Sequence, residues 1–226
     1  MILGQTGQPF FRWNWVVDHL DDVAEATREH LLLTFTAVSI GLALSLVLGI
    51  LSLRNERLYG WVTGAAGILY SIPSLSAFAL LVPFFGLTLT SAVIPLVTYT
   101  LLILIRNIVT GLRGVDPHVV EAARGMGYSD RAVLWRVEMP LALPVIIAGV
   151  RIATVTTVGL VTVASLIGYG GLGGMILSGL RARSIPFPTE IIVGTLGAVL
   201  LAAVLDVALL LAQRLLTPWR HRAVGG

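Results

Sequence analysis

Two ionisable side chains interrupt long apolar stretches of this sequence, where a charge is unusual. Arg151 is the only charged residue between positions 139 and 180, and Asp206 is the only one between 191 and 213. Charged groups inside a membrane are costly, so they are usually paired or face a functional pathway. At 1.5 Å per residue, Arg151 and Asp206 each lie roughly 11–16 Å from the nearer end of the membrane spans expected at 141–166 and 191–213. We expect the two to pair and lock their helices together; separate exposure to a water-filled pathway is the alternative.

A polar segment at 106–140 contains a second set of candidate residues. Its five arginines are mixed with four carboxylates, so it is not a uniformly basic surface. Asp116 before Pro117 predicts the start of a short helix, and Gly127 predicts its end. A second helix is expected to begin at Ser129 as its N-cap and to run to the end of the segment, where the next span begins.

Small residues in the first of these helices would allow the backbone of a partner to approach closely. They are Ala122, Ala123 and Gly125, while Glu121 and Arg124 could make charged contacts at the rim of the contact. On local composition alone, an ordinary solvated connecting helix is the favoured interpretation, because such residues are common in helices.

Three glycines, Gly168, Gly170 and Gly173, satisfy the G-x-G-x-x-G pattern of dinucleotide sites by letter. That pattern requires a preceding strand within a βαβ unit, whereas here it follows a long apolar stretch. Tight packing or a helix break is a better interpretation, with a plain loop equally consistent. Other chemistry is excluded directly. Without lysine the chain cannot carry a Walker A loop, and without cysteine it has no disulfide or thiolate metal site.

The composition indicates an integral membrane protein of the all-α class. Of the 226 residues 56% are hydrophobic and 12% are charged, about half the charged share of a soluble domain, and the mean hydropathy is +0.91. A spanning helix needs roughly 20 apolar residues. Five spans are therefore expected, at 31–53, 61–82, 87–105, 141–166 and 191–213.

The distribution of arginines predicts the orientation in the membrane. Ten arginines fall in the segments on one side of the expected spans and four on the other, and basic residues favour the cytoplasmic side. The N-terminus is thereby expected outside and the C-terminus in the cytoplasm. Residues 1–30 would form an outer segment with a short interfacial helix, 31–213 the transmembrane domain and 214–226 a cytoplasmic tail. The scattered arginines do not suggest binding to nucleic acid.

The polar segment resembles the EAA loop of permeases from ATP-binding-cassette importers. Its Glu-Ala-Ala, Gly and Pro match the family pattern at full spacing, and Val137 and Met139 replace the usual Ile and Leu conservatively. In that family the loop is a coupling helix, which seats in a cleft of the ATPase subunit and transmits its closure. The resemblance therefore implies coupling roles for Glu121, Ala122, Ala123, Arg124, Gly125, Gly127 and Pro140.

Other segments resemble the osmoprotectant branch of these importers, which takes up glycine betaine, choline, carnitine and related quaternary amines. The resemblance covers about 31–213 and implies the type I importer permease fold. Methionine-importer permeases, which are similar in size, layout and Gly-rich segment, are the near alternative. The resembling segments are 71–75, 106–107, 110–112, 114–117, 148–151 and 168–173, and they suggest a substrate pathway near Ser71, Pro73, Ser74, Gly168, Gly170, Gly171 and Gly173.

The resulting prediction is a permease subunit of a binding-protein-dependent importer in a bacterial cytoplasmic membrane, with no enzymatic activity and no bound cofactor or metal of its own. The implied partners are two ATPase subunits holding ATP and Mg²⁺, a second or paralogous permease, an extracytoplasmic substrate-binding protein and membrane lipid. A proton-coupled secondary transporter using Arg151 and Asp206 is less favoured, because the spans show no inverted repeat. An intramembrane enzyme is disfavoured because its metal-binding, paired-aspartate and serine-nucleophile motifs are missing.

Overall fold

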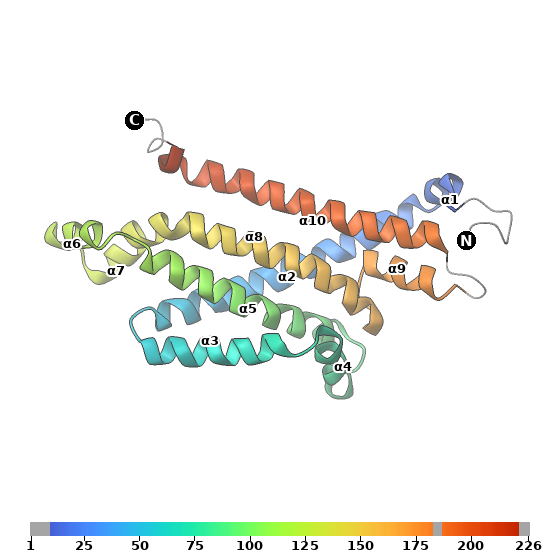
Figure 1. The fold of residues 1–226 in the computed structure, drawn as a ribbon, viewed down its shortest axis with the longest axis horizontal. Helices are drawn as coiled ribbons and strands as arrows, with labels where there is room; N and C mark the ends of the chain where they lie inside the picture. Colours follow the sequence, from blue (N-terminus) through green and yellow to red (C-terminus); the bar gives the residue numbers. More distant parts are fainter. Residues whose placement is uncertain (1–9, 183–186, 222–226) are drawn as a thin grey trace. The chain divides into compact units, whose positions relative to one another are not determined.

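The computed structural model describes residues 10–182 and 187–221, and within these ranges the chain is helical and has no strand (Figure 1). The predicted all-α class is confirmed. In chain order the helices are α1 Trp13–Asp18, α2 Leu20–Ser52, α3 Glu56–Ser71, α4 Ser74–Phe85, α5 Leu89–Arg113, α6 Pro117–Gly125, α7 Asp130–Val133, a π-helical turn Leu134–Glu138, α8 Met139–Ala164, a 3-10 turn Ser165–Ile167, α9 Leu172–Leu180, α10 Pro188–Leu216 and a 3-10 turn Pro218–His221.

The described part of the chain contains four helices that are long and apolar enough to cross a membrane, and five spans if α3 and α4 count as one bent span. This agrees with the predicted layout of about five. The ends differ from those expected. Helix α2 begins at Leu20, so the boundary expected after residue 30 falls inside a helix, and α5 continues to Arg113. The short helix expected near the N-terminus is present as α1, and its place at the membrane surface stays a prediction.

The second span is not the single helix that the sequence predicts. The chain turns by 92° between α3 and α4. The cause is Pro73, which has no N–H to donate and forces the preceding residue out of the helical region, so that Ile72 has φ −65° and ψ 128°. The break expected at 83–86, between the second and third spans, is present: α4 ends at Phe85, and Gly86 caps it with φ +69°, although Pro83 itself lies inside α4.

The chain forms two compact units, each assembled from three segments. The first comprises residues 1–37, 73–96 and 156–204, and the second comprises 38–72, 97–155 and 205–226. In the first unit, α9 and α10 pack together through Leu172, Met175 and Ala198, with Trp15, Val23 and Ala26 against them. In the second unit, helices α5 and α8 share a core with the end of α2, built on Leu104, Ile108, Leu112, Ala142, Ile146 and Ala153.

In the first unit, the segment before α1 is held against the start of α10. The Arg12 N–H donates to the Thr189 hydroxyl at 3.0 Å, and the Arg12 guanidinium lies 4.8 Å from the centre of the Phe187 ring. Trp15 meets the same ring edge-on at 5.3 Å. These contacts make α1 a part of the first unit.

Candidate functional site

Helix α6 begins where the sequence predicts. The Asp116 carboxylate accepts a hydrogen bond from the His118 N–H at 2.9 Å, and Pro117 occupies the first helical position. This combination satisfies one of the free N–H groups of the first turn and removes another, because proline has none. The start of the helix is therefore set locally, by residues adjacent in sequence.

The other end of α6 is closed by two hydrogen bonds around Gly127. The Gly127 N–H donates to the Arg124 carbonyl at 2.9 Å, and the Tyr128 N–H donates to the Ala123 carbonyl at 3.2 Å. The pair is a Schellman motif, which needs one residue in the left-handed region. Gly127 is that residue, with φ +85°. The sequence prediction for this helix end is confirmed.

The second helix of the loop also begins as predicted but does not stop at Pro140. The Ser129 hydroxyl accepts a hydrogen bond from the Ala132 N–H at 3.3 Å, which caps α7. From there a π-helical turn leads directly into α8, with Pro140 in its first turn. Pro140 has no N–H and would clash with a carbonyl four residues earlier, and the wider turn before it changes that spacing. The loop therefore joins the membrane through a continuous helix.

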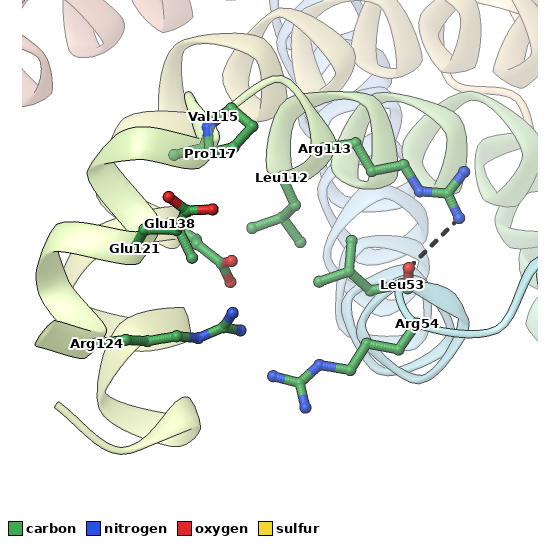
Figure 2. Close-up of a pocket in the computed structure, with 10 residues that line it drawn as sticks. Leu53, Arg54, Leu112, Arg113, Val115, Pro117, Glu121, Arg124 and Glu138 are labelled. Atoms are coloured by element: carbon green, nitrogen blue, oxygen red, sulfur yellow. Dashed lines mark hydrogen bonds between the residues drawn. The ribbon is translucent and has the colours of Figure 1, made fainter.

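One face of α6 lines a cavity of about 320 Å³ (Figure 2). Residues at helical spacing, three and four positions apart, share a face, and here they are Pro117, Val120, Glu121 and Arg124. The other walls come from the end of α2, the end of α5 and the π-helical turn: Leu53, Arg54, Leu112, Arg113, Val115 and Glu138. Figure 2 shows the Arg54 and Arg124 guanidinium groups pointing toward one another across the opening.

The two guanidinium groups at this opening share one carboxylate. Asp130 of α7 lies 3.4 Å from Arg54 and 3.3 Å from Arg124, and all three side chains are at least half exposed. Exposed ion pairs of this kind contribute roughly 0–1 kcal/mol each. The cavity-lining face of α6 is thus linked to the end of α2 by weak, solvent-screened ion pairs.

The opposite face of α6 is apolar and exposed. Met126 is 72% exposed and Val119 is 42% exposed, with the exposed Ala122 between them in the same stripe. Ala123 corrects the sequence expectation, because it is only 2% exposed and packs inside the chain. Close approach by a partner is therefore available at Ala122 and Gly125. The exposed Met126 was not singled out from the sequence, although its position one residue before the terminal glycine was visible.

The two intramembrane charges form the predicted pair, within the second unit. The Arg151 Nε donates to Asp206 Oδ1 at 2.8 Å, and its NH2 group donates to Oδ2 at 2.7 Å. This bidentate geometry matches the planar guanidinium to the planar carboxylate and is the strong form of an arginine–carboxylate ion pair. The side chains are 26% and 33% exposed. The pair ties α8 to α10, and its role in locking the two helices stays a prediction.

The residues expected near a substrate pathway lie in two places. Ser71 ends α3 in the second unit, where its hydroxyl donates to the Ile68 carbonyl at 2.7 Å. Pro73 and Ser74 begin α4 in the first unit, and α4 packs against the 3-10 turn that precedes Gly168. Their role in a pathway stays a prediction.

Three glycines of the segment 168–173, Gly170, Gly171 and Gly173, pack tightly in the first unit. A Cβ on Gly171, which has φ +48°, would lie 2.7 Å from the backbone nitrogen of His30, and one on Gly173 would lie 2.5 Å from the backbone of Thr162. His30 itself is fully buried, and its Nε2 lies 3.0 Å from the Val158 carbonyl. The tight-packing interpretation is confirmed for Gly170 and Gly173, whereas a Cβ on Gly168 would meet no atom within 4 Å. His30, at the end of a polar run, was not singled out from the sequence.

Gly171→Ala is expected to lower the free energy of unfolding by about 2–4 kcal/mol, from a strained positive φ and an overpacked contact with α2. Gly168→Ala is the matched control, because it shares a positive φ (+88°) but its Cβ would meet no atom within 4 Å. It is expected to cost about 1–2 kcal/mol. Thermal unfolding of the purified chain in detergent compares them, and equal losses would contradict the packing argument.

Comparison with known proteins decides the family. Residues 41–222, which include the capped loop and the Arg151–Asp206 pair, match the family model of the binding-protein-dependent transport system inner membrane component. The chain belongs to this family. As the sequence predicts, it is the permease subunit, and thus a transport component, of a binding-protein-dependent importer in the bacterial cytoplasmic membrane.

Individual relatives share much of the sequence. The chain is 38% identical over 210 residues to an osmoprotectant import permease of Salmonella typhimurium, covering 91% of this permease and 96% of the relative. It is 37% identical over 192 residues to a choline transport permease of Bacillus subtilis and to a carnitine transport permease of Listeria monocytogenes, covering 85% of this permease and 87% of each relative.

Solved structures show the same fold. The MetNI methionine ABC transporter in an inward-facing form matches with a TM-score of 0.78 and 24% identity, covering 88% of this permease and 98% of the other chain. An amino acid ABC transporter matches with a TM-score of 0.69 and 20% identity, covering 90% and 98%. At these identities the likeness concerns the fold alone, and it confirms the predicted type I importer permease fold.

Proposed function

We propose that this permease imports small quaternary amines of the osmoprotectant class, such as glycine betaine, choline or carnitine. The observation that carries the proposal is the substrate named for its relatives. Permeases for choline, for carnitine and for osmoprotectants are each at least 37% identical to it over 85% of its length or more. An extracytoplasmic binding protein would deliver the substrate, and the N-terminus would face that side.

The energy for transport would come from separate ATPase subunits, which hold ATP and Mg²⁺. Two of them would dock on two permeases, either two copies of this chain or this chain and a paralogue. The exposed apolar stripe of α6, with Ala122 and Met126, is the surface offered to the ATPase cleft. Apolar residues that are well exposed in one chain are expected at surfaces that a partner covers.

The loop is built to transmit a displacement. Helix α6 is held to the end of α2 by the exposed Asp130 ion pairs, whereas α7 continues through the π-helical turn into α8. A pull on α6 would therefore break weak contacts at the cavity and move the start of α8. The Arg151–Asp206 pair then connects α8 to α10, so that both helices move together.

The test is reconstitution of this permease with its ATPase and binding protein in liposomes, with ATP hydrolysis measured against glycine betaine, choline, carnitine and methionine. Stimulation by at least one quaternary amine is expected. Stimulation by methionine alone would keep the importer and overturn the substrate class. If no binding protein stimulates hydrolysis with any substrate, the importer mechanism itself is contradicted.

Met126→Asp is expected to lower the stimulated ATP hydrolysis at least about tenfold, because placing a charge in an apolar contact leaves it unpaired on docking, a loss of a few kcal/mol. Met126→Leu keeps an apolar side chain of similar volume and is expected to retain most of the activity. Co-purification of the ATPase with each variant separates lost docking from lost catalysis. Equal activity of the two variants would exclude Met126 from the docking surface.

A further inference from the structure

The break after α3 leaves backbone carbonyls without partners inside a membrane span. The 16 residues of α3 put the break about 24 Å from its first residue, within the roughly 30 Å of the hydrocarbon core. The Ile72 N–H bonds to the Leu69 carbonyl at 3.3 Å, but in the described chain no backbone N–H donates to the carbonyls of Tyr70 or Ser71. Such groups are not tolerated against lipid, and at this depth they face either protein or a water-filled cavity.

Two tyrosine rings, which contact one another, lie at this break within the second unit. Tyr99 of α5 is 5% exposed, and its hydroxyl donates to the Ile72 carbonyl, which fixes the backbone at the break. The Tyr70 ring meets the Tyr99 ring edge-on, with centroids 5.6 Å apart and planes at 71°. Tyr70 is 38% exposed, so it is the aromatic surface that remains open beside the free carbonyls.

The chemistry of this surface selects for a cation. The C-terminus of a helix carries a partial negative charge, concentrated on its unpaired carbonyls. An aromatic face attracts cations through its quadrupole, and quaternary ammonium groups, which have no N–H to donate, depend on that attraction. The sequence from 58 to 105 contains no charged residue, so α3, α4 and the first part of α5 bring no carboxylate or arginine to the break.

We propose that the C-terminal end of α3, with its free carbonyls and the Tyr70 ring, binds the quaternary ammonium group of the substrate during its passage. Tyr70 is the residue that contacts the cation, and Tyr99 is a positioning residue that holds the Ile72 carbonyl and orients the Tyr70 ring. The inference rests on the proposed function, because it names the part of an osmoprotectant that the permease itself recognises. It also assigns a role to Ser71, whose backbone carbonyl is one of the two free carbonyls at the helix end.

Replacing Tyr70 tests the assignment in the reconstituted importer. Tyr70→Leu removes the aromatic face and is expected to lower choline uptake per ATP hydrolysed about two- to thirtyfold, as the loss of a cation–π contact of roughly 0.5–2 kcal/mol requires. Tyr70→Phe keeps the face and is expected to transport normally. Trp61→Leu is the matched control, because Trp61 is a 79% exposed aromatic residue on the same helix, far from the break.

A direct binding measurement accompanies the transport assay. Saturation-transfer NMR with tetramethylammonium chloride, and with tert-butanol as a neutral probe of similar shape, is applied to the purified permease in nanodiscs. Wild type and Tyr70→Phe are expected to bind the cation in preference to the alcohol, and Tyr70→Leu is expected to lose that preference. Size-exclusion profiles of all variants establish that they are folded.

The outcomes separate the subsite from the importer function. The assignment is overturned if Tyr70→Leu reduces uptake no more than Trp61→Leu, or if Tyr70→Phe and Tyr70→Leu fail equally, since the ring would then serve only packing. If the wild-type importer is stimulated by no quaternary amine, the proposed function fails, and tetramethylammonium binding decides the subsite by itself. A wild-type permease without preference for the cation overturns it.

Discussion

Gly127→Val is expected to lower substrate-stimulated ATP hydrolysis about five- to thirtyfold while leaving the membrane helices folded. Gly127 sits at φ +85° and closes the Schellman motif at the end of α6. Placing an L-amino acid other than glycine in the left-handed region costs about 1–2 kcal/mol of conformational energy, and a β-branched residue there is a severe outlier. An added Cβ would meet no atom within 4 Å, so the expected loss comes from the backbone conformation. The expected five- to thirtyfold loss follows from this cost, because about 1.4 kcal/mol corresponds to a tenfold change in an equilibrium constant.

Two neighbouring substitutions isolate that cause. Gly127→Asn adds a side chain of comparable size but a type that tolerates the left-handed region, and it is expected to retain most of the activity. Gly125→Ala lies in the last turn of α6, where a Cβ also meets no atom within 4 Å and the backbone is helical. It is expected to be neutral or slightly favourable to the helix. Substrate-stimulated ATP hydrolysis in liposomes is measured for all three.

Full activity of Gly127→Val would contradict the view that the end of α6 must be held in this conformation. A loss shared equally by Gly127→Asn would point to a requirement for free space at this position in the docked complex, and would contradict the backbone explanation. Circular dichroism of each variant shows whether the helical content of the whole chain is kept.

Loss of the Arg151–Asp206 pair is expected to destabilise the permease more than any exposed ion pair. Arg151→Met or Asp206→Leu leaves one charge alone in a membrane helix, which costs roughly 2.5–3.5 kcal/mol. The double replacement removes both charges, so its cost is expected to fall well below the sum of the single costs. A coupling energy of about 2 kcal/mol or more in the double-mutant cycle is the result that we expect.

The pair of Glu25 and Arg28 provides the matched control. Its atoms are 3.0 Å apart, a distance comparable with the 2.7 Å in the intramembrane pair, but both side chains are 69% exposed. An exposed pair three positions apart on a helix is expected to show a coupling energy of roughly 0.2–0.5 kcal/mol. Unfolding in mixed detergent micelles measures both cycles. Additive costs for Arg151 and Asp206 would show that each charge interacts separately with its surroundings, and the proposed lock between α8 and α10 would fail.

Local signals were enough to predict the two capped helices of the loop at 106–140. The caps at Asp116 and Ser129 and the left-handed Gly127 are each set by residues within a few positions in sequence, and the structure places all three as expected. The long apolar stretches likewise predicted the membrane helices, because a spanning helix requires a minimum length of continuous apolar sequence. The pairing of Arg151 with Asp206 followed from the scarcity of charges in those stretches.

Features that depend on tertiary contacts could not be read in the same way. Proline is ambiguous in an apolar sequence: Pro73 breaks a span, whereas Pro83, Pro95 and Pro144 lie inside helices. At the break the Ile72 carbonyl accepts a hydrogen bond from the hydroxyl of Tyr99, 27 positions away, and a contact so distant in sequence is not visible in the local pattern. The burial of Ala123 depends in the same way on neighbours that its own helix does not contain.

The π-helical turn at Leu134–Glu138 also determines where a change of chain length would leave the register of α8 intact. Such a turn carries one more residue than an α-helical turn, so deletion of a single residue there can convert it to α-helix and leave the rest in register. A deletion after Met139, between the turn and Arg151, would instead rotate all following side chains by about 100° and carry Arg151 away from its partner. A change of one residue in length is therefore expected to be tolerated within the π-helical turn, because the side chains of the following membrane helix keep their directions there.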